Sequence, residues 1–211
     1  MSHAALMDRI YRFQRYFYDA TRVLFLPGRD VLIDAVACAP GMTVLEMGCG
    51  TGRNLIKLAR HHQETRFFGV DISQEMLRTA KKRIAQTGFD GRITVCHSSA
   101  ETVHHRRTFG LDAPFDAVIF SYALTMMPTF GEALEAARVT LTPTGVLYAV
   151  DFWDAAGWPA PLRLLLKRWL ALFHVRFDTQ MHAEIRRRFP STEIRQLLGR
   201  YAFLALPEET R

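Results

Sequence analysis

Residues 44–52 read Val-Leu-Glu-Met-Gly-Cys-Gly-Thr-Gly, and this stretch decides the fold. Its apolar first half is typical of a buried strand, and its glycines follow the spacing Gly-x-Gly-x-Gly. Glycine permits a tight turn and leaves the backbone open to a ligand. The helix that follows presents free amides and a partial positive charge at its first turn. The stretch therefore predicts a strand, a ligand-binding loop and a helix, with Cys49 as a small residue in contact with the backbone.

Short apolar runs alternate with helical stretches outward from this loop. The expected strands cover residues 43–47, 67–71, 93–97, 116–122 and 145–151, and the expected helices cover residues 52–62, 73–87 and 129–141. Each strand is rich in β-branched or aromatic residues and is too short for a buried helix. Ser73 is expected to cap its helix and Gly88 to end it. This alternation predicts an α/β fold with a mostly parallel sheet and helices on both faces.

The remaining segments are expected to complete a single domain of 211 residues. A helix over residues 179–188 and an antiparallel strand pair, 192–197 with 201–206, should follow the fifth strand. The predicted parts are an N-terminal helical cap (1–39), a core (40–154), an inserted helix (155–178) and the closing helix and strand pair (179–211). The cap and the insertion are expected over the carboxyl ends of the strands, where open α/β sheets bind ligands.

Composition excludes several classes of protein. Hydrophobic residues make up 49% of the chain and charged residues 23%, which excludes wholesale disorder and fibrous repeats. We expect a cytoplasmic protein with peripheral membrane contact, because no apolar run reaches the roughly 18 residues of a membrane span and no secretory signal is visible. Cys38, Cys49 and Cys96 are expected as reduced thiols. The net charge of +6 either favours acidic partners or serves solubility.

Other site chemistries find no support in the sequence. It holds no RNP1 motif, zinc finger or leucine zipper, so no nucleic-acid partner is expected. His61 and His62 are adjacent, as are His104 and His105, and adjacent side chains point apart. No metal site is therefore expected. No serine or cysteine nucleophile with a histidine partner is recognisable, which argues against nucleophilic hydrolysis.

The glycine-rich stretch resembles motif I of the class I S-adenosylmethionine-dependent methyltransferases. Asp71 ends the second strand 19 residues after Gly52, where that superfamily places a carboxylate on both ribose hydroxyls. Residues 99–101 read Ser-Ala-Glu where the superfamily contacts adenine, although many relatives have Asp in place of Ser99. Residues 115–122 resemble motif IV, which runs into the active site. The resemblance covers about residues 40–152.

This resemblance implies S-adenosylmethionine as cofactor and S-adenosylhomocysteine as product. The cofactor-binding residues that it implies are Glu46, Gly48, Cys49, Gly50, Gly52, Asp71, Ile72, Met76, Ser99, Ala100, Glu101 and Ser121. The backbone amide of Ala100 is expected to read the adenine ring. A nicotinamide dehydrogenase is less well supported, because in the motif Gly-x-Gly-x-x-Gly the third glycine comes one residue later.

A narrower resemblance lies outside the core. Residues 11–22, 28–30, 170–175 and 199–202 are similar to segments of the bacterial betaine-lipid N-methyltransferases, which convert diacylglyceryl-homoserine to diacylglyceryl-N,N,N-trimethylhomoserine. This similarity implies a lipid substrate and methylation of a headgroup amine. Three alternatives remain open: a phosphatidylethanolamine methyltransferase, another small-molecule methyltransferase such as one for a quinone precursor, and a non-catalytic protein that binds S-adenosylmethionine.

Aromatic and acidic residues are candidates for the acceptor side of this site. Repeated methylation of an amine ends in a permanent cation, which the aromatic faces of Tyr18, Tyr122 and Trp153 could stabilise. Asp151, at the end of the fifth strand, is expected to accept the amine proton or attract the ammonium. Tyr11 lies seven residues before Tyr18 and so on the same helix face, which either covers the cofactor or packs on the core.

Two further features each allow two interpretations. Arg29 binds the methionine carboxylate or a lipid headgroup, or it forms a surface ion pair with Asp30 or Asp34. Residues 161–175 predict a helix with a wide apolar, tryptophan-containing surface and the cations Arg163, Lys167 and Arg168. Such a helix lies on an anionic membrane surface, or it packs on the core with solvated arginines.

Overall fold

The computed structural model describes residues 25–171, 175, 177 and 180–208. They form a seven-stranded sheet with the order β3-β2-β1-β4-β5-β7-β6. The strands are β1 (Thr43–Met47), β2 (Arg66–Asp71), β3 (Ile93–His97), β4 (Phe115–Ser121), β5 (Leu141–Phe152), β6 (Thr192–Leu197) and β7 (Ala202–Pro207). The first five run parallel, while β7 runs antiparallel to both β5 and β6. The expected α/β fold with an antiparallel closing pair is confirmed.

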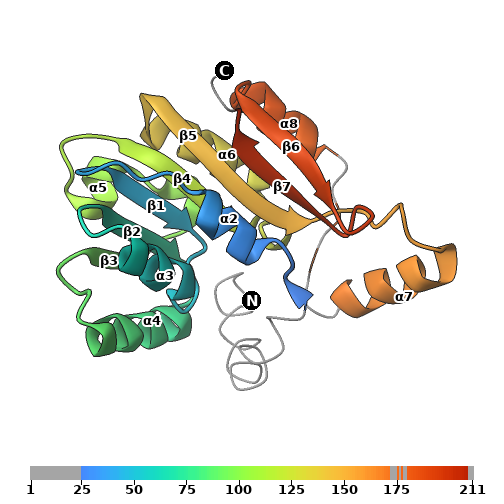
Figure 1. The fold of residues 1–211 in the computed structure, drawn as a ribbon, viewed down its shortest axis with the longest axis horizontal. Helices are drawn as coiled ribbons and strands as arrows, with labels where there is room; N and C mark the ends of the chain where they lie inside the picture. The colour runs from blue at the N-terminus through green and yellow to red at the C-terminus, as the bar shows by residue number, and fades with distance from the viewer. Residues whose placement is uncertain (1–24, 172–174, 176, 178–179, 209–211) are drawn as a thin grey trace.

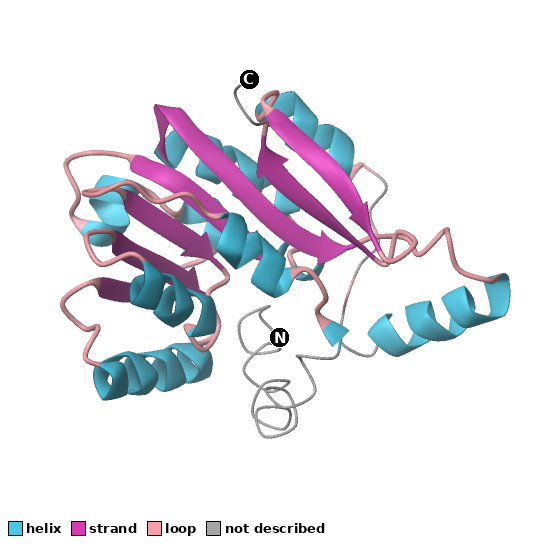
Figure 2. Cartoon of the chain, in the orientation of Figure 1, coloured by secondary structure: helices cyan, strands magenta, loops and turns pink. Residues whose placement is uncertain are grey.

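Helices cover both faces of this sheet (Figure 1; Figure 2). They are α2 (Arg29–Ala35), α3 (Arg53–His61), α4 (Gln74–Thr87), α5 (His105–Phe109), α6 (Phe130–Thr140), α7 (Ala160–Ala171) and α8 (Met181–Arg188), with the 3₁₀ turns η1 (Ala100–Thr102) and η2 (Leu124–Met126). Leu32, Leu55 and Leu77 of α2, α3 and α4 belong to one apolar core. Leu134 of α6 and Ile185 of α8 belong to a second core. Because both faces are covered, every residue of β1 is buried.

Local sequence signals set most of the element boundaries. Ser73 caps α4 by accepting a 3.3 Å hydrogen bond from the amide of Met76, and Gly88 ends that helix with φ of 71°. The expected start of the fifth strand at residue 145 is wrong, because β5 already begins at Leu141, opposite Phe115. A register shift follows, and pairing resumes between Ala117 and Val146. The intervening Thr-Pro-Thr-Gly reads as a turn but forms the irregular part of the strand.

The two additions to the core differ in how they meet it. Helix α2 packs its buried Leu32 and Ile33 into the first core. Helix α7 lies beyond the carboxyl end of β5 and extends away from the sheet, with Leu170 buried against the same core (Figure 1). Among the described residues, no helix is both long and apolar enough to cross a membrane. Tyr11 and Tyr18 lie outside the described residues.

Candidate functional site

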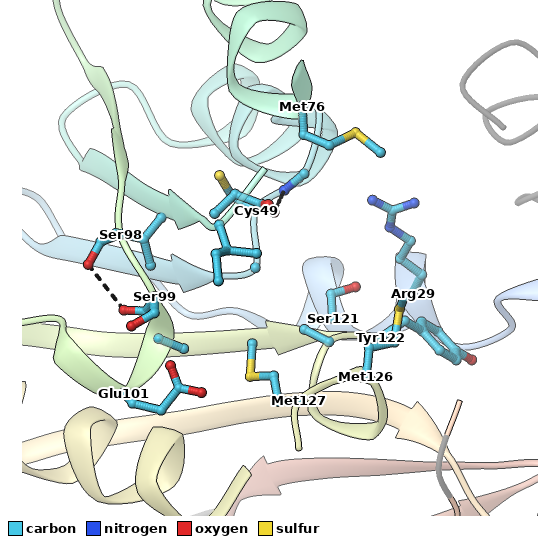
Figure 3. A pocket seen from close by; sticks show the side chains of 17 residues that line it. Arg29, Cys49, Met76, Ser98, Ser99, Glu101, Ser121, Tyr122, Met126 and Met127 are labelled. Carbon is cyan, nitrogen blue, oxygen red and sulfur yellow. Dashed lines mark hydrogen bonds between the residues drawn. The ribbon is translucent and has the colours of Figure 1, made fainter. Parts of the chain in front are cut away.

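A pocket opens at the carboxyl ends of the central strands, where open α/β sheets bind ligands. The residues expected at the cofactor site or the acceptor side that line it are Arg29, Gly48, Cys49, Gly50, Asp71, Ile72, Met76, Ser99, Ala100, Glu101, Ser121 and Tyr122. The residues that sequence reasoning missed are Val70, Ser98, Ala123, Met126 and Met127. Figure 3 shows side chains from separate elements around this one space.

The glycine loop forms the floor of this pocket. Gly48 and Gly50 have φ of 78° and 53°, a left-handed conformation that glycine adopts without strain. A Cβ on Gly48 would lie 2.8 Å from the Cβ of Ala123, so a side chain there would collide with the loop after β4. A Cβ on Gly50 would meet no atom within 4 Å. The backbone of Gly50 therefore faces open space that a ligand can fill.

Two loop residues support the pocket from behind. Gly52 does not line the cavity; it precedes α3, and a Cβ there would lie 3.3 Å from the Cβ of Ala80 on α4. Its small size permits close helix packing rather than ligand contact. The Cys49 thiol contacts β2, since a Cβ on Gly69 would come within 2.8 Å of its sulfur. Burial raises the pKa of the Cys49 thiol well above its usual value, which suits a packing role and not a nucleophile.

Asp71 connects the end of β2 to the glycine loop. Its Oδ2 accepts a 2.8 Å hydrogen bond from the amide of Gly50, and its Oδ1 accepts a 2.9 Å bond from the amide of Ser73. Each carboxylate oxygen has two lone pairs, so each can accept a further bond. The carboxylate thus fixes the glycine loop and the start of α4 from the end of β2. This arrangement fits the diol of a ribose.

A buried hydrogen-bond chain links β1 to the pocket. Glu46 is 1% exposed and does not line the cavity. Its Oε1 accepts a 2.6 Å bond from Nδ2 of Asn54, and Oδ1 of Asn54 accepts a 2.9 Å bond from Nε of Arg29. Glu46 therefore acts on the pocket through Arg29 rather than by direct contact. Asp30 and Asp34, the surface partners considered for Arg29, form ion pairs with Lys57, with N–O distances of 3.1 and 2.8 Å.

The far end of the pocket combines an apolar wall with short polar groups. Ile72 and Met76 supply apolar surface, and η1 starts at the buried Ala100. The hydroxyl of Ser99 lies 3.0 Å from that of Thr102, so it is held within its own turn. Glu101 accepts a short hydrogen bond from Thr129. An apolar wall beside the turn after β3 suits a flat heteroaromatic ring such as adenine.

Tyr122 lines the pocket in a strained conformation. Its φ of 54° is rare for a non-glycine residue, and such strain gathers at functional sites. The phenol donates a 2.5 Å hydrogen bond to the carbonyl of Pro27, and the ring packs edge-on against Phe152 with centroids 4.7 Å apart. Burial raises the pKa of this phenol far above its usual value. Tyr122 is thus a fixed wall and not a proton acceptor.

Two residues expected on the acceptor side do not line this pocket. Asp151 is fully buried, where it accepts bonds from the hydroxyl and the amide of Thr125 at 2.5 and 3.1 Å. Asp151 therefore fixes η2 through Thr125 and does not contact the space where an amine would bind. Trp153 lines a smaller neighbouring cavity and stacks on His182 with centroids 4.1 Å apart. The guanidinium of Arg200 lies 4.8 Å from the Trp153 centroid, so this ring already contacts a cation.

The donor set around the pocket fits S-adenosylmethionine. Asp71 suits the ribose diol, the open backbone at Gly50 permits close approach, and Arg29 presents a guanidinium that could pair with a carboxylate. Within the described part of the chain, no cluster of three or more His, Cys, Asp or Glu residues is placed to hold a metal ion.

Comparison with known sequences gives consistent matches. A family model described as a methyltransferase domain matches residues 39–188. The ubiquinone/menaquinone biosynthesis C-methyltransferase UbiE of Klebsiella pneumoniae is 28% identical over 121 residues, or 57% of this chain and 46% of that protein. The 2-phytyl-1,4-naphtoquinone methyltransferase of Trichormus variabilis is 27% identical over 125 residues, or 59% of this chain and 52% of that protein. The chain thus spans about half the length of these curated relatives.

Solved structures share the fold. The phosphoethanolamine N-methyltransferase 2 of Haemonchus contortus, in complex with S-adenosylmethionine, superposes with a TM-score of 0.74 at 16% identity, covering 93% of this chain and 46% of that one. An O-methyltransferase family protein from Burkholderia thailandensis superposes with a TM-score of 0.71 at 20% identity, covering 92% and 59%. The matched domain and the cofactor pocket agree, and the chain belongs to the class I S-adenosylmethionine-dependent methyltransferases.

Proposed function

We propose that the protein transfers the methyl group of S-adenosylmethionine to the amine of a polar lipid headgroup, with diacylglyceryl-homoserine as acceptor and its trimethylated form as final product. The observation that carries this proposal is the position of exposed apolar surface beside the cofactor pocket. Tyr122 lines the pocket, and its phenol donates a hydrogen bond to the carbonyl of Pro27. Pro27 in turn lines an apolar groove along α7. An acceptor with a polar head and an apolar body matches that pair of surfaces.

The chain's own residues have to position two reactants. S-adenosylmethionine supplies an activated sulfonium methyl, so the protein needs chiefly to hold an amine in line with it. We assign Asp71 to the ribose and Arg29 to the methionine carboxylate. Ser121 ends β4, Tyr122 follows it, and both line the same pocket. The phenol of Tyr122 donates its hydrogen bond to Pro27 and its pKa is raised, so we do not assign it as a base. In this proposal the amine binds in its neutral form, and the proton that each methylated ammonium must lose before the next transfer passes to solvent.

Helix α7 supports peripheral contact with an anionic membrane from the cytoplasmic side. Its exposed residues include Leu162, Leu164 and Leu165, and its cations are Arg163, Lys167 and Arg168. Leucine with basic residues is the composition of an interfacial helix. Trp169 contributes less than its size suggests, because its ring packs on Phe25 with centroids 4.8 Å apart. We assign the membrane contact to Leu164 and the neighbouring cations, because Leu162 and Leu165 line the apolar groove.

A quinone precursor is the second candidate acceptor. The relatives from Klebsiella pneumoniae and Trichormus variabilis are named for ubiquinone/menaquinone biosynthesis and for 2-phytyl-1,4-naphthoquinone. A prenylated ring also joins a polar reactive part to an apolar tail, and so matches the same two surfaces. Methylation at carbon would leave no cationic product, which separates the two candidates chemically.

The deciding experiment supplies both acceptors to the purified protein. Vesicles containing diacylglyceryl-homoserine, or a demethylated prenyl quinol in detergent, are incubated with methyl-labelled S-adenosylmethionine, and products are resolved by mass spectrometry. We expect mono-, di- and trimethylated lipid. Label only on quinol carbon would favour the second candidate. No label in either acceptor, with cofactor binding intact, would overturn both candidates and leave a methyltransferase for another acceptor, such as phosphatidylethanolamine, or a non-catalytic binding protein.

A further inference from the structure

A second cavity, the α7 groove, is almost entirely apolar. It is lined by Phe25, Pro27, Trp158, Leu162, Leu165, Leu166, Trp169, Leu198 and Tyr201. Three of its leucines are strongly exposed: Leu162 at 53%, Leu165 at 65% and Leu198 at 64%. Scattered exposed leucines need no explanation, but a contiguous apolar cavity marks a binding site.

The polar atoms of two aromatic residues in this groove are engaged elsewhere. The indole nitrogen of Trp158 donates a 2.8 Å hydrogen bond to the carbonyl of Leu198, and the phenol of Tyr201 donates a 2.9 Å bond to the carbonyl of Phe25. The two rings also stack, with centroids 5.6 Å apart. A ligand in the groove would therefore meet the carbon faces of these rings and not their hydrogen-bonding groups. This surface suits hydrocarbon.

One contact joins the α7 groove to the cofactor pocket. Pro27 lines the groove, and its carbonyl accepts the 2.5 Å hydrogen bond from Tyr122, which lines the pocket. Arg29, two residues further along the chain, also lines the pocket. The groove and the pocket therefore meet at Pro27 and Tyr122, beside the place where a methyl acceptor must bind.

We propose that the α7 groove binds one hydrocarbon chain of the amphiphilic methyl acceptor, so that the headgroup passes Pro27 and reaches Tyr122. This proposal rests on the proposed function for the identity of the ligand. A single chain is the occupant that fits best, because the groove is concave and α7 forms only one of its walls. The other walls are Phe25 and Pro27 before α2, and Leu198 and Tyr201 beside β7.

Intrinsic fluorescence provides a direct test. The chain has three tryptophans, and two of them, Trp158 and Trp169, line the groove. The probe is a lysophospholipid with a dibrominated stearoyl chain, because bromine quenches nearby indoles. It is used below its critical micelle concentration so that only monomers are present. We expect saturable quenching with one binding site per protein. A variant with Trp158→Phe and Trp169→Phe should lose most of this quenching, since Trp153 lies in a different cavity.

Two matched leucine variants distinguish probe binding in the groove from non-specific hydrophobic binding to α7. Leu165→Asp places a charge in the groove at a position that is already 65% exposed, whereas Leu164→Asp changes a residue that is 53% exposed and lies outside it. We expect Leu165→Asp to weaken probe affinity at least about tenfold and Leu164→Asp to change it by less than about twofold. Circular dichroism should show both variants folded.

Each other outcome overturns the proposal in its own way. Quenching that appears only with micelles or vesicles, equally in both leucine variants, would assign this surface to the bilayer. The absence of quenching would show that the groove does not bind a hydrocarbon chain, and a protein partner would then be the next candidate occupant. Because the probe assay needs no methyl transfer, lipid methylation without quenching would overturn the groove alone. Quenching without methylation would overturn the proposed function alone.

Discussion

The side-chain amide of Asn54 donates a 2.6 Å hydrogen bond to the buried carboxylate of Glu46. Its oxygen also accepts the 2.9 Å bond from Arg29, so one amide orients the acid behind the pocket and the guanidinium that lines it. Asn54 lies in the second residue of α3, directly after the glycine loop. The loop and the start of α3 therefore position Arg29 together.

Replacing Asn54 with leucine should reduce both stability and cofactor affinity. The carboxylate of Glu46 loses a buried donor, which should cost about 1–3 kcal/mol of unfolding free energy. We expect S-adenosylmethionine to bind about tenfold more weakly, equivalent to about 1.4 kcal/mol. Binding of 5′-methylthioadenosine, which lacks the carboxylate, should change much less. Calorimetry with both ligands checks this. Equal losses for the two ligands would show that Arg29 does not bind the methionine carboxylate. Lys57→Met on the same helix is the control.

Asp71→Asn should weaken binding of S-adenosylmethionine by about 1–3 kcal/mol, because charge-assisted bonds to the ribose are lost. Part of the loss should arise from the glycine loop, since an amide nitrogen cannot accept the bond from Gly50. Asp112→Asn, an exposed residue on the far side of α5, is the matched control. Unchanged affinity in calorimetry of the folded Asp71 variant would show that the ribose contact belongs to another residue.

Asp151 should make stability depend on pH in a defined direction. Burial raises its pKa to about 6 in the folded chain, against about 3.9 in the unfolded chain. The folded state therefore binds this proton more tightly, and its contribution to stability is greatest below about pH 4 and is lost as the pH rises through 6. Relative to Asp151→Asn, the unfolding free energy should fall by on the order of 1–3 kcal/mol between those limits. Urea unfolding across pH measures this, and a constant or rising difference would contradict the account.

Membrane contact through α7 should depend on salt only in part. Each basic residue near an anionic surface contributes about 1 kcal/mol, which salt screens, whereas burial of leucine persists. We expect binding to anionic vesicles to weaken but survive as salt rises. Arg163→Glu with Lys167→Glu should remove most of it and spare cofactor affinity. The control is Arg106→Glu with Arg107→Glu on α5, and vesicle co-sedimentation gives the readout. If both double variants co-sediment equally, or if neither the wild type nor any variant co-sediments, α7 packs on the core and does not contact the membrane.

Local spacing predicted several of the residues that line the pocket at the glycine loop. Gly48, Gly50 and Asp71 stand at the ends of β1 and β2, and adjacent parallel strands bring those ends together. The turn geometry follows from nearby glycines, and the alternation of strands and helices predicts that these strands pair in parallel. The same reasoning placed Ser121 and Tyr122 at the end of β4.

The acceptor side could not be read in this way. Asp151 and Trp153 stand at the end of β5, but successive residues of a strand face opposite sides, and the sequence does not show which side is covered. Asp151 faces Thr125 and Trp153 faces His182, a residue 29 positions later in the chain. The α7 groove likewise joins Phe25, Trp158 and Tyr201, which only tertiary packing brings together.

The most direct test of the central claim compares two glycines under titration with S-adenosylmethionine. Gly50 and Gly110 both have positive φ, of 53° and 69°, and a Cβ on either would meet no atom within 4 Å. Only Gly50 lines the pocket. Valine should strain both backbones similarly, so circular dichroism should report two comparably folded variants. We predict that the wild type and Gly110→Val bind one cofactor per chain by calorimetry, whereas Gly50→Val binds none. Normal binding by Gly50→Val, or no binding by the wild type, would contradict the assignment of this pocket.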